Sequence, residues 1–431
     1  MVHGSRSFGH CRTPPSAAPP GRPASCQGRH RASTSFQWFR SDGGDPAELV
    51  ADYLAGDGLD VRNIGRTDEQ ECPTGAGSIC GAALYVSADA GSVMSGGSLG
   101  APSPVPGIPD VYAVVYRHTD AGFPPAPPPA ASFSPVAPPA AGFSPGPSPA
   151  GGFSPGPPAD DGFELGAWTP SWTPAEHAAA VTSVREAIGR GDVYQVNVVG
   201  HTSAPYTGSP LAVLHRVAAL PGARYGGVLE GPGWALATAS PETLVEVRGG
   251  RVITRPIKGT RPATAEGRRE LLASVKERAE HVMIVDLSRN DLSRLPGVGP
   301  VTVDELFAVR RWSGLWQAES VVSAPVTGRL GLPDLLRALV PGGSVTGAPK
   351  IAALSLIAGL EPVGRGVSMA AVGWIGRNHV DLGLTIRTVA ADGNLVHAWA
   401  GGGIVWDSDP EAEVAEAAAK LAPIKAALAG R

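Results

Sequence analysis

The sequence is poor in cysteine and has no excess of charge of either sign. Only four of its 431 residues are cysteines, all within the first eighty positions and none in a Cys-x-x-Cys pair, so zinc and dithiol redox sites are poorly supported. The net charge of −4 gives no electrostatic case for nucleic acid. No run of eighteen apolar residues occurs, and the N-terminus lacks the apolar stretch of a secretory signal. We therefore expect a soluble cytoplasmic protein with no membrane-spanning part.

Composition divides the chain into four parts. Residues 1–35 are rich in Arg, Ser, Pro and Gly without periodicity, and we expect a disordered extension. Residues 36–122 are weakly patterned and should pack on the catalytic domain. Residues 123–165 repeat Phe-Ser-Pro units among Pro, Ala and Gly, which predicts a flexible spacer rather than a binding segment. Helical and strand patterns alternate over 166–431, which fits one large mixed domain. Thr173-Pro-Ala-Glu176 predicts a helix start in this domain, with Thr173 as the N-cap, proline at the first helical position and Glu176 closing a capping box.

One lysine stands at the end of an expected strand. Apolar and polar residues alternate on both sides of Gly249-Gly250, the pattern of a hairpin, and the chain continues Arg255-Pro-Ile-Lys-Gly-Thr260. Partial burial lowers the pKa of a lysine, so Lys258 is a candidate nucleophile or acid/base group. A surface loop lysine is the competing interpretation, and by itself the motif favours it.

Two expected helices carry paired carboxylates. Ser274 and Glu277 have the spacing of a capping box, and Glu280 follows one turn later. Near the C-terminus, Asp409-Pro410 opens a helix on which one face carries Glu413, Glu416 and Lys420. Such hard oxygen donors suit a magnesium ion that keeps waters and takes its other ligands from an anionic substrate. Solvated charged helix faces are the simpler interpretation of each helix taken alone.

Two glycine-rich turns lie between these helices. Pro341-Gly-Gly-Ser-Val-Thr-Gly-Ala-Pro-Lys350 precedes a helix whose free N–H groups could hold an anion, but Pro349 and the glycine spacing exclude a nucleotide phosphate loop. The glycines of Ala400-Gly-Gly-Gly-Ile404 follow a strand and let a ligand approach the backbone. Arg387 ends another strand and could bind a carboxylate bidentately. Together these residues suggest an enzyme with a dicarboxylate ligand, a magnesium ion and a strand-borne lysine.

These motifs, in this order, resemble the chorismate-utilising enzymes, and the likeness covers about residues 166–425. It rests on Gly191-Asp-Val-Tyr-Gln-Val, Pro256-Ile-Lys-Gly-Thr, Lys276-Glu-Arg-Ala-Glu-His-Val-Met-Ile-Val-Asp-Leu-Ser-Arg-Asn-Asp-Leu292, Gly343-Ser-Val-Thr-Gly-Ala-Pro-Lys350, Ile386-Arg-Thr and Gly401-Gly-Gly-Ile-Val-Trp-Asp-Ser-Asp-Pro410. The resemblance implies an α+β fold with two large antiparallel sheets packed together, flanking helices, and one magnesium-dependent site that binds chorismate.

The resemblance also implies roles for individual residues. It makes Glu280 and Glu416 the direct metal ligands, with Glu277 and Glu413 as their neighbours. It makes Arg387 the partner of the enolpyruvyl carboxylate. The other substrate-carboxylate positions are Thr346, Gly347, Gly401, Gly403 and Lys420. The implied catalytic positions are Gln195, Lys258, Thr260 and His281, with His281 beside the leaving hydroxyl.

Two positions select among the branches of this family. Water-adding members (isochorismate and salicylate synthases) carry a lysine base where this chain has Gln195. Anthranilate synthases have alanine where this chain has Lys258, whereas the aminodeoxychorismate synthases have lysine. The resemblance is therefore greatest to aminodeoxychorismate synthase component I, which implies amination of chorismate at C4 in the p-aminobenzoate and folate pathway. Because the sequence shows no Gly-x-Cys-x-Gly nucleophile turn, ammonia should come from a separate glutaminase subunit.

Two departures from the family pattern affect the expected pocket. Ser368 stands where many members have a tyrosine that helps to bind a substrate carboxylate, and Gln317 stands where many have a histidine. Three alternatives stay open at this stage. They are anthranilate synthase component I, a water-adding synthase, and a catalytically silent subunit that binds a partner through the proline-rich segment.

Overall fold

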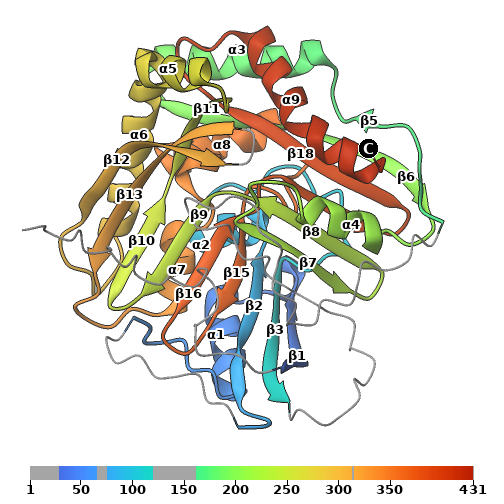
Figure 1. Ribbon diagram of the computed structural model, residues 1–431, viewed down its shortest axis with the longest axis vertical. Helices are drawn as coiled ribbons and strands as arrows, with labels where there is room; N and C mark the ends of the chain where they lie inside the picture. Colours follow the sequence, from blue (N-terminus) through green and yellow to red (C-terminus); the bar gives the residue numbers. More distant parts are fainter. Residues whose placement is uncertain (1–28, 66–74, 120–161, 313–314, 431) are drawn as a thin grey trace, which may run out of the picture.

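Two antiparallel sheets account for the strands in the part of the chain that the structure describes. The computed structural model describes residues 29–65, 75–119, 162–312 and 315–430 (Figure 1). Most of the segments expected to be a disordered extension (1–35) and a flexible insert (123–165) lie outside these ranges. The described chain already begins with a strand at Arg29, inside the segment that was expected to lie outside the fold. This strand was not predicted because it lies at a sheet edge, and its polar residues give little apolar alternation.

The first sheet has ten strands. Its order is β1-β3-β2-β15-β16-β9-β10-β13-β11, and β12 pairs with β13 outside this path. N-terminal strands thus lie beside strands from near the C-terminus, since β2 pairs with β15. The strands are β1 (Arg29–Trp38), β2 (Ile79–Val86), β3 (Val111–Thr119), β9 (Thr243–Arg248), β10 (Arg251–Arg255), β11 (Ile257–Pro262), β12 (Thr302–Trp312), β13 (Leu315–Pro325), β15 (Ala371–Ile375) and β16 (Val380–Leu384).

The second sheet has eight strands, in the order β14-β6-β18-β17-β8-β7, with β4 and β5 also paired to β6. Its longest pairing joins β6 to β18 and runs from Pro205 opposite Leu395 to Val196 opposite Ile404. The strands are β4 (Glu164–Leu165), β5 (Thr169–Pro170), β6 (Gln195–Thr207), β7 (Tyr225–Gly231), β8 (Trp234–Ser240), β14 (Gly347–Ala348), β17 (Thr388–Asp392) and β18 (Leu395–Ile404).

Helices flank both sheets. In Figure 1, α9 lies along β18, and α3 packs against α9 at the top of the view. The pair α5 and α6 packs on β11, β12 and β13, while α8 packs on β6 and β14. The helices are α1 (Pro46–Gly56), α2 (Ala88–Ser95), α3 (Pro174–Arg190), α4 (Leu211–Ala218), α5 (Ala265–Ala273), α6 (Val275–Ser293), α7 (Leu332–Leu339), α8 (Lys350–Leu360) and α9 (Pro410–Leu428), with short 3-10 helices η1 (Arg40–Asp42) and η2 (Gly343–Val345).

The predicted helix starts are present. Thr173 caps α3 through a capping box with Glu176, and Pro174 is the first helical residue. Asp409 caps α9 by accepting a hydrogen bond from Ala412 N. The α9 glutamates and Lys420 therefore begin in the first turns of a helix whose start is fixed by the sequence.

The two sheets share one hydrophobic core. The largest cluster of buried side chains joins Leu84 and Val245 of the first sheet to Leu236 and Trp399 of the second. The alternating patterns along the strands place these side chains on the facing surfaces. This packing confirms the predicted α+β fold with two large antiparallel sheets packed together.

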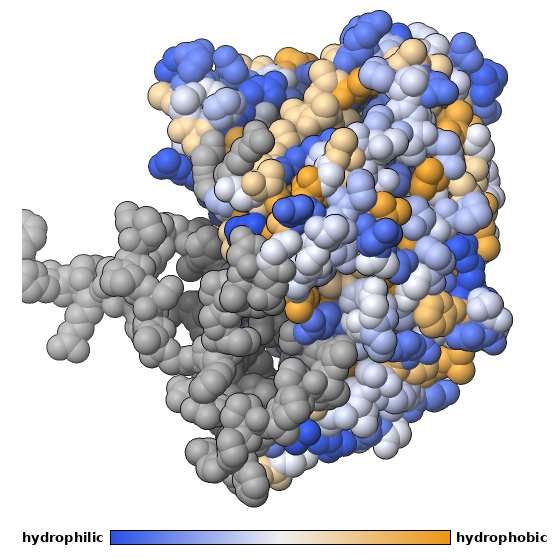
Figure 2. Space-filling model, turned by 90° about the vertical axis from the view of Figure 1, so that its right-hand side faces the viewer, coloured by the Kyte–Doolittle hydropathy of each residue, from blue (hydrophilic) through white to orange (hydrophobic). Residues whose placement is uncertain are grey.

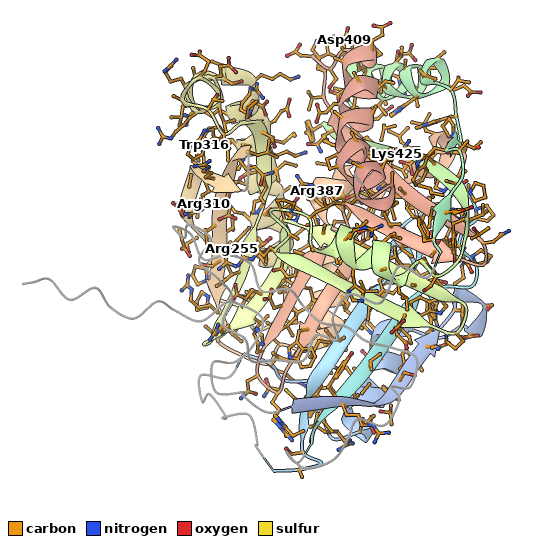
Figure 3. All side chains as sticks on the ribbon, turned by 45° about the vertical axis from the view of Figure 1, so that its right-hand side comes forward. Arg255, Arg310, Trp316, Arg387, Asp409 and Lys425 are labelled. Carbon is orange, nitrogen blue, oxygen red and sulfur yellow. The ribbon has the colours of Figure 1, made fainter. Side chains whose placement is uncertain are left out.

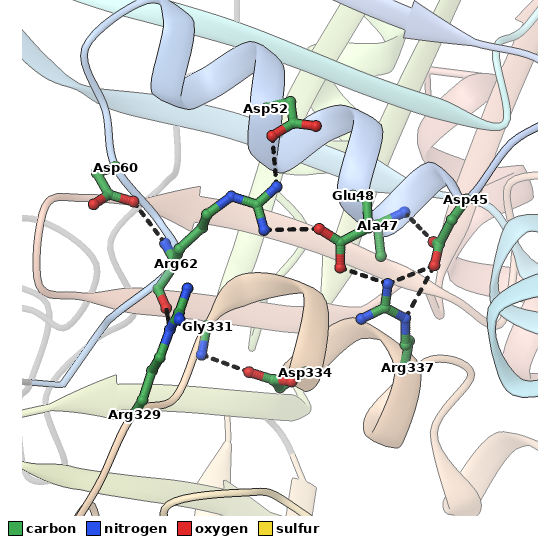
Figure 4. A network of polar contacts seen from close by, with 10 residues as sticks. All are labelled: Asp45, Ala47, Glu48, Asp52, Asp60, Arg62, Arg329, Gly331, Asp334 and Arg337. Atoms are coloured by element: carbon green, nitrogen blue, oxygen red, sulfur yellow. Dashed lines mark hydrogen bonds and ion pairs between the residues drawn. The ribbon is translucent and has the colours of Figure 1, made fainter.

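An ionic network joins the N-terminal helix α1 to α7 (Figure 4). Arg337 donates to Asp45, the N-cap of α1, and to Glu48, whose other oxygen accepts from Arg62 at 2.7 Å. Arg62 also reaches Asp52. These side chains are partly exposed, so the network orients α1 more than it stabilises the fold.

On the face shown in Figure 2, polar and apolar side chains are interspersed. In the part of the chain that the structure describes, no helix is long and apolar enough to cross a membrane.

Candidate active site

Gln195, Lys258 and Gly403 meet where the two sheets come together. A Cβ atom added to Gly403 would lie 2.8 Å from Gln195 Nε2 and 3.1 Å from Lys258 Nζ. Gln195 begins β6, Lys258 lies on β11, and Gly403 lies near the end of β18. The β6–β18 register places Gly403 opposite Asn197, two residues from Gln195. Three expected site residues from distant parts of the chain therefore share one small space.

Lys258 is held on a bulged strand. The pairing of β11 with β13 shifts between Lys258 and Thr260, and Gly259 adopts φ +78°, which favours glycine. Burial lowers the pKa of Lys258, and nearby Lys420 lowers it further, while Glu242, Glu280 and Glu416 act in the opposite direction. The neutral, nucleophilic form of this amine is thus more accessible than in an exposed lysine.

Carboxylates from α6 and α9 approach this lysine. Burial raises the pKa of Glu280, and repulsion from Glu277 and Glu413 adds to the shift. Burial likewise raises the pKa of Glu413, which accepts a hydrogen bond from Ser408 at 2.7 Å. Mutual repulsion between side chains of the two helices indicates that α6 and α9 present their carboxylates toward a common region.

The remaining acidic positions are paired with cations. Glu416 Oε1 lies 2.7 Å from Lys420 Nζ, and Glu277 accepts from Arg261 at 3.0 Å. Lys276 Nζ lies 3.8 Å from Glu280. Burial opposes ionisation of Glu416, yet the ion pair with Lys420 leaves its pKa below the ordinary value.

The donor set fits a hard cation but is not a preformed metal cage. Among the described residues, no group of three or more His, Cys, Asp or Glu side chains is arranged to hold a metal ion. Magnesium commonly takes one or two protein carboxylates and completes its shell with water and substrate oxygens. Glu280 and Glu416, with Glu277 and Glu413 beside them, supply donors of that kind.

Arg387 is available to bind an anion. It lies between β16 and β17 in a left-handed conformation with φ +51°, and its carbonyl accepts from Ala239 N at 3.1 Å. Burial lowers the pKa of its guanidinium. Among the described residues this guanidinium has no ion-pair partner, and Figure 3 places it between the β12–β13 region and α9. A half-buried, unpaired arginine in this position can receive a carboxylate.

The glycine turns surround the same space. A side chain at Gly401 would collide with Val198 O, and one at Gly402 would lie 2.7 Å from Glu413 Oε2. Lys420 Nζ donates to Gly401 O at 2.8 Å, which ties α9 to β18. Gly347 packs its Cα against the backbone of Gln195, where a Cβ would lie 2.1 Å from the carbonyl oxygen. Thus β18 and β14 need glycine for close backbone packing.

Two of the predicted residues have hydrogen-bond partners within the protein, and a third is exposed. The Thr346 hydroxyl donates to Gly342 O at 2.8 Å and is fully buried, so it closes the turn. His281 is also fully buried, its Nε2 lies 2.6 Å from Ser320 Oγ, and burial lowers its pKa to about 4. His281 is therefore neutral near pH 7. Thr260 lies opposite Gln317 on the exposed part of β11.

The sequence analysis did not identify Glu242. This side chain follows β8, is 7% exposed, and accepts from Ser344 Oγ at 2.8 Å. Burial raises its pKa to about 7, while Ser344, Lys258 and the backbone N–H of Ile257 act in the opposite direction. The available signal was a glutamate two residues beyond a strand end, in Ser240-Pro-Glu242, but such a glutamate is usually exposed.

The buried ion pair of Arg365 and Glu361 connects the backbone segments that carry the site residues. Arg365 donates to both oxygens of Glu361, to Val345 O at 2.6 Å and to Asn197 O at 2.7 Å. Glu361 in turn accepts from Val199 N at 2.9 Å. This pair joins β6, which carries Gln195, to the turn that carries Thr346.

The two departures from the family pattern are both buried. Gln317 is 4% exposed, and its Oε1 has no hydrogen-bond partner among the described residues. Ser368 is fully buried and donates to Thr385 O at 3.4 Å. A buried amide without a partner for its oxygen is costly unless a ligand or water donates to it.

Residues 153–426 match the family model of chorismate binding enzymes. The chain is 41% identical over 258 residues to anthranilate synthase component 1 of Streptomyces coelicolor, covering 58% of this chain and 50% of that protein. It is 37% identical over 257 residues to aminodeoxychorismate synthase component 1 of Salmonella typhimurium, covering 58% and 57%. The chain thus spans about half the length of the curated relatives it matches.

A solved structure has the same fold. Anthranilate synthase component I from Streptococcus pneumoniae TIGR4 superimposes with a TM-score of 0.69, covering 97% of this chain and 95% of that one at 24% identity.

Proposed function

Because the chain belongs to the family of chorismate binding enzymes, we propose that it aminates chorismate at C4, as an aminodeoxychorismate synthase component I. One observation carries the choice of branch. Lys258 is half-buried with a lowered pKa at the position where the sequence resemblance expects a nucleophile, and the neighbouring side chain from β6 is Gln195 and not a second lysine. A neutral amide can position a substrate but cannot act as the base that a water-adding enzyme needs.

Cationic groups would receive the two carboxylates of the substrate. The guanidinium of Arg387 would receive the enolpyruvyl carboxylate, and Lys420 with the backbone of Gly401 and Gly403 would receive the ring carboxylate. Magnesium held by Glu280 and Glu416 would supply electrostatic stabilisation of the ring carboxylate and of the leaving hydroxyl. The unpaired state of Arg387 among the described residues supports this arrangement, because a bound dianion would supply its missing partner.

The covalent route begins with Lys258. Its neutral amine attacks C2 of chorismate, the two ring double bonds shift, and the C4–O bond breaks. Glu242 gives its proton to the departing hydroxyl, so water leaves and Glu242 becomes a carboxylate. Ammonia then forms a bond to C4, the double bonds return, and the electron pair of the C2–N bond goes back to Lys258. One difficult substitution is thereby divided into two allylic steps.

Glu242 suits the acid role by its surroundings. Its pKa of about 7 leaves a large protonated fraction at neutral pH, which an exposed glutamate lacks. It also interacts electrostatically with Lys258. The product would be 4-amino-4-deoxychorismate, a precursor of p-aminobenzoate for folate.

A separate glutaminase subunit would supply the ammonia. The curated relatives are named as component 1, which supports a second component. No Gly-x-Cys-x-Gly turn occurs in this sequence, whose cysteines all precede residue 81. Free ammonium should replace the partner in vitro.

Lys258→Ala tests the covalent route. Wild-type protein, chorismate, ammonium chloride and magnesium should give 4-aminated product by chromatography and mass spectrometry, and the variant should lose it. Lys425→Ala is the matched control, because burial also lowers the pKa of Lys425, which lies over the Trp168 ring away from the site. Unchanged 4-amination by Lys258→Ala would sink the covalent mechanism.

Anthranilate synthase component I is the second candidate, since the Streptomyces coelicolor relative is 41% identical. It predicts 2-aminated product from the wild-type protein and no chemical role for Lys258. The same product analysis separates the two candidates.

A further inference from the structure

A second pocket lies beside the reacting lysine. Its cavity volume of about 30 Å³, room for one or two molecules the size of water, lies between the start of β9, β10, α6 and the turn at η2. The polar side chains of its lining are those of Glu242, Thr243, Thr254, Ser288, Asp291 and Ser344. No lysine, arginine or histidine occurs among its described lining residues. The pocket therefore offers oxygen acceptors and apolar walls, and no cationic side chain.

Its character is opposite to that of the chorismate side. On the proposed substrate side, Arg387, Lys420 and Lys258 would attract a dianion, and a bound magnesium ion would offset the Glu280 and Glu416 carboxylates. In the pocket, Asp291 Oδ2 is held 3.1 Å from Lys350, which lies outside the lining, whereas Glu242 forms no ion pair with any residue that the structure describes. A chorismate dianion would be repelled here, whereas a small hydrogen-bond donor of positive or zero charge would be accepted.

Glu242 lies between this pocket and the proposed chorismate site. Its carboxyl group lines the pocket, interacts electrostatically with Lys258, and accepts from the backbone N–H of Ile257, the residue before Lys258. Its hydrogen bond from Ser344 fixes it between the pocket and β11. A molecule in the pocket is thus separated from the reacting lysine by one carboxyl group.

We propose that this pocket is the ammonium-binding site of the enzyme, and that Glu242 takes the proton that converts bound ammonium into the attacking ammonia. The inference rests on the proposed function and deepens it. Glu242 becomes a carboxylate when its proton leaves with the C4 hydroxyl. One ammonium N–H bond then breaks, the proton returns to Glu242, and the freed lone pair forms the N–C4 bond as Lys258 leaves C2.

The protons balance over the cycle. Chorismate and ammonium give water and the protonated amine of the product, and both Glu242 and Lys258 return to their starting forms. Burial brings the pKa of Glu242 closer to the pKa of ammonium than the pKa of an exposed glutamate is. The smaller difference in pKa lowers the free energy needed to move a proton from ammonium to Glu242.

Filling the pocket tests the inference. Ser288 is half-buried on α6, and Ser288→Leu places a larger apolar side chain at the lining. We expect the KM for ammonium chloride to rise at least tenfold, with the KM for chorismate changed less than twofold. Ser293→Leu is the control, because Ser293 lies on the same helix, is exposed, and makes a similar hydrogen bond to a helix carbonyl.

Potassium supplies a second readout. It resembles ammonium in size and charge but cannot react, so potassium chloride should compete with ammonium in wild type more strongly than sodium chloride at equal ionic strength. This competition should be lost in Ser288→Leu. If Ser288→Leu fails to fold, Thr254→Val removes one acceptor with little change of volume, and it should raise the ammonium KM severalfold.

The outcomes separate the two proposals. A folded Ser288→Leu protein with an unchanged ammonium KM, or a Thr254→Val protein with the wild-type value, overturns the pocket assignment while leaving C4 amination intact. Amination at C2 by wild type overturns the proposed function, and the pocket is still judged on the ammonium KM. Absence of any amination by wild type overturns both.

Discussion

Asp381 should make the protein less stable at neutral pH than at mildly acidic pH. This β16 carboxyl group is 4% exposed and accepts from the Tyr225 hydroxyl at 2.6 Å. Burial raises the pKa of Asp381 to about 6, and repulsion from Glu246 raises it as well. The hydrogen bond from Tyr225 and the charges of Arg224 and Arg255 act in the opposite direction. Removing the charge should therefore stabilise the folded state wherever Asp381 is ionised.

The sign follows from the direction of the shift. The folded state holds the Asp381 proton more tightly than the unfolded state, so the group favours folding below pH 3.8, and stability falls as pH rises toward about 6. A difference of about two pKa units corresponds to about 3 kcal/mol, reached fully above pH 6. Asp381→Asn keeps an oxygen that accepts from Tyr225, so we expect up to that gain at pH 7.5 and none near pH 4.

Urea unfolding of wild type and variant at several pH values between 4 and 8 measures this difference. Asp286→Asn is the control, because Asp286 lies on α6 with 73% of its side chain exposed. The Asp381→Asn gain should grow with pH, and the control difference should stay near zero. A gain that does not change with pH, or a loss at pH 7.5, would refute the linkage argument.

Three further predictions concern the site and its supports. Glu242→Gln should lower kcat for amination about 10²–10⁴-fold with little change in the chorismate KM, and an unchanged kcat in steady-state assays would remove Glu242 from the chemistry. Arg365→Met should cost about 3–5 kcal/mol of unfolding free energy in urea, because Glu361 stays buried without its partner, and a loss under 1 kcal/mol would contradict this. Arg337→Ala should cost about 1 kcal/mol or less, and the cost should shrink in 1 M salt, since the Arg337 pairs are partly exposed; a loss insensitive to salt would argue against ion pairing.

The sequence predicted the parts of this structure that depend on local pattern or extended motifs. Thr173 and Asp409 cap their helices as expected, because capping needs only neighbouring residues. The motif order predicted the two-sheet fold, and the family match confirms it. That Lys258, Gln195 and Gly403 lie close together was predicted from the family resemblance. The alternation of apolar and polar residues could not predict it, because the pairing of strands far apart in the sequence brings these residues together.

Other features depend on contacts that no local pattern encodes. Glu242 is buried only because Ser344, about a hundred residues later, and the β11 backbone satisfy its oxygens. The hydroxyl of Thr346, expected to face the substrate, closes its own turn. The start of β1 was not predicted, because its polar residues show no strand pattern and only the pairing with β3 makes it a strand.

The pairing of β2 with β15 has a consequence for synthesis of the chain. All eight residues of β2 are buried, and β2 obtains its second partner only when Ala371–Ile375 has left the ribosome, nearly three hundred residues later. At translation rates of about 5–20 residues per second, that interval lasts tens of seconds. Throughout it, β2 presents an apolar strand edge on which another nascent chain could pair. Production of this protein should therefore respond to chaperone supply and to growth temperature more than its final stability would suggest.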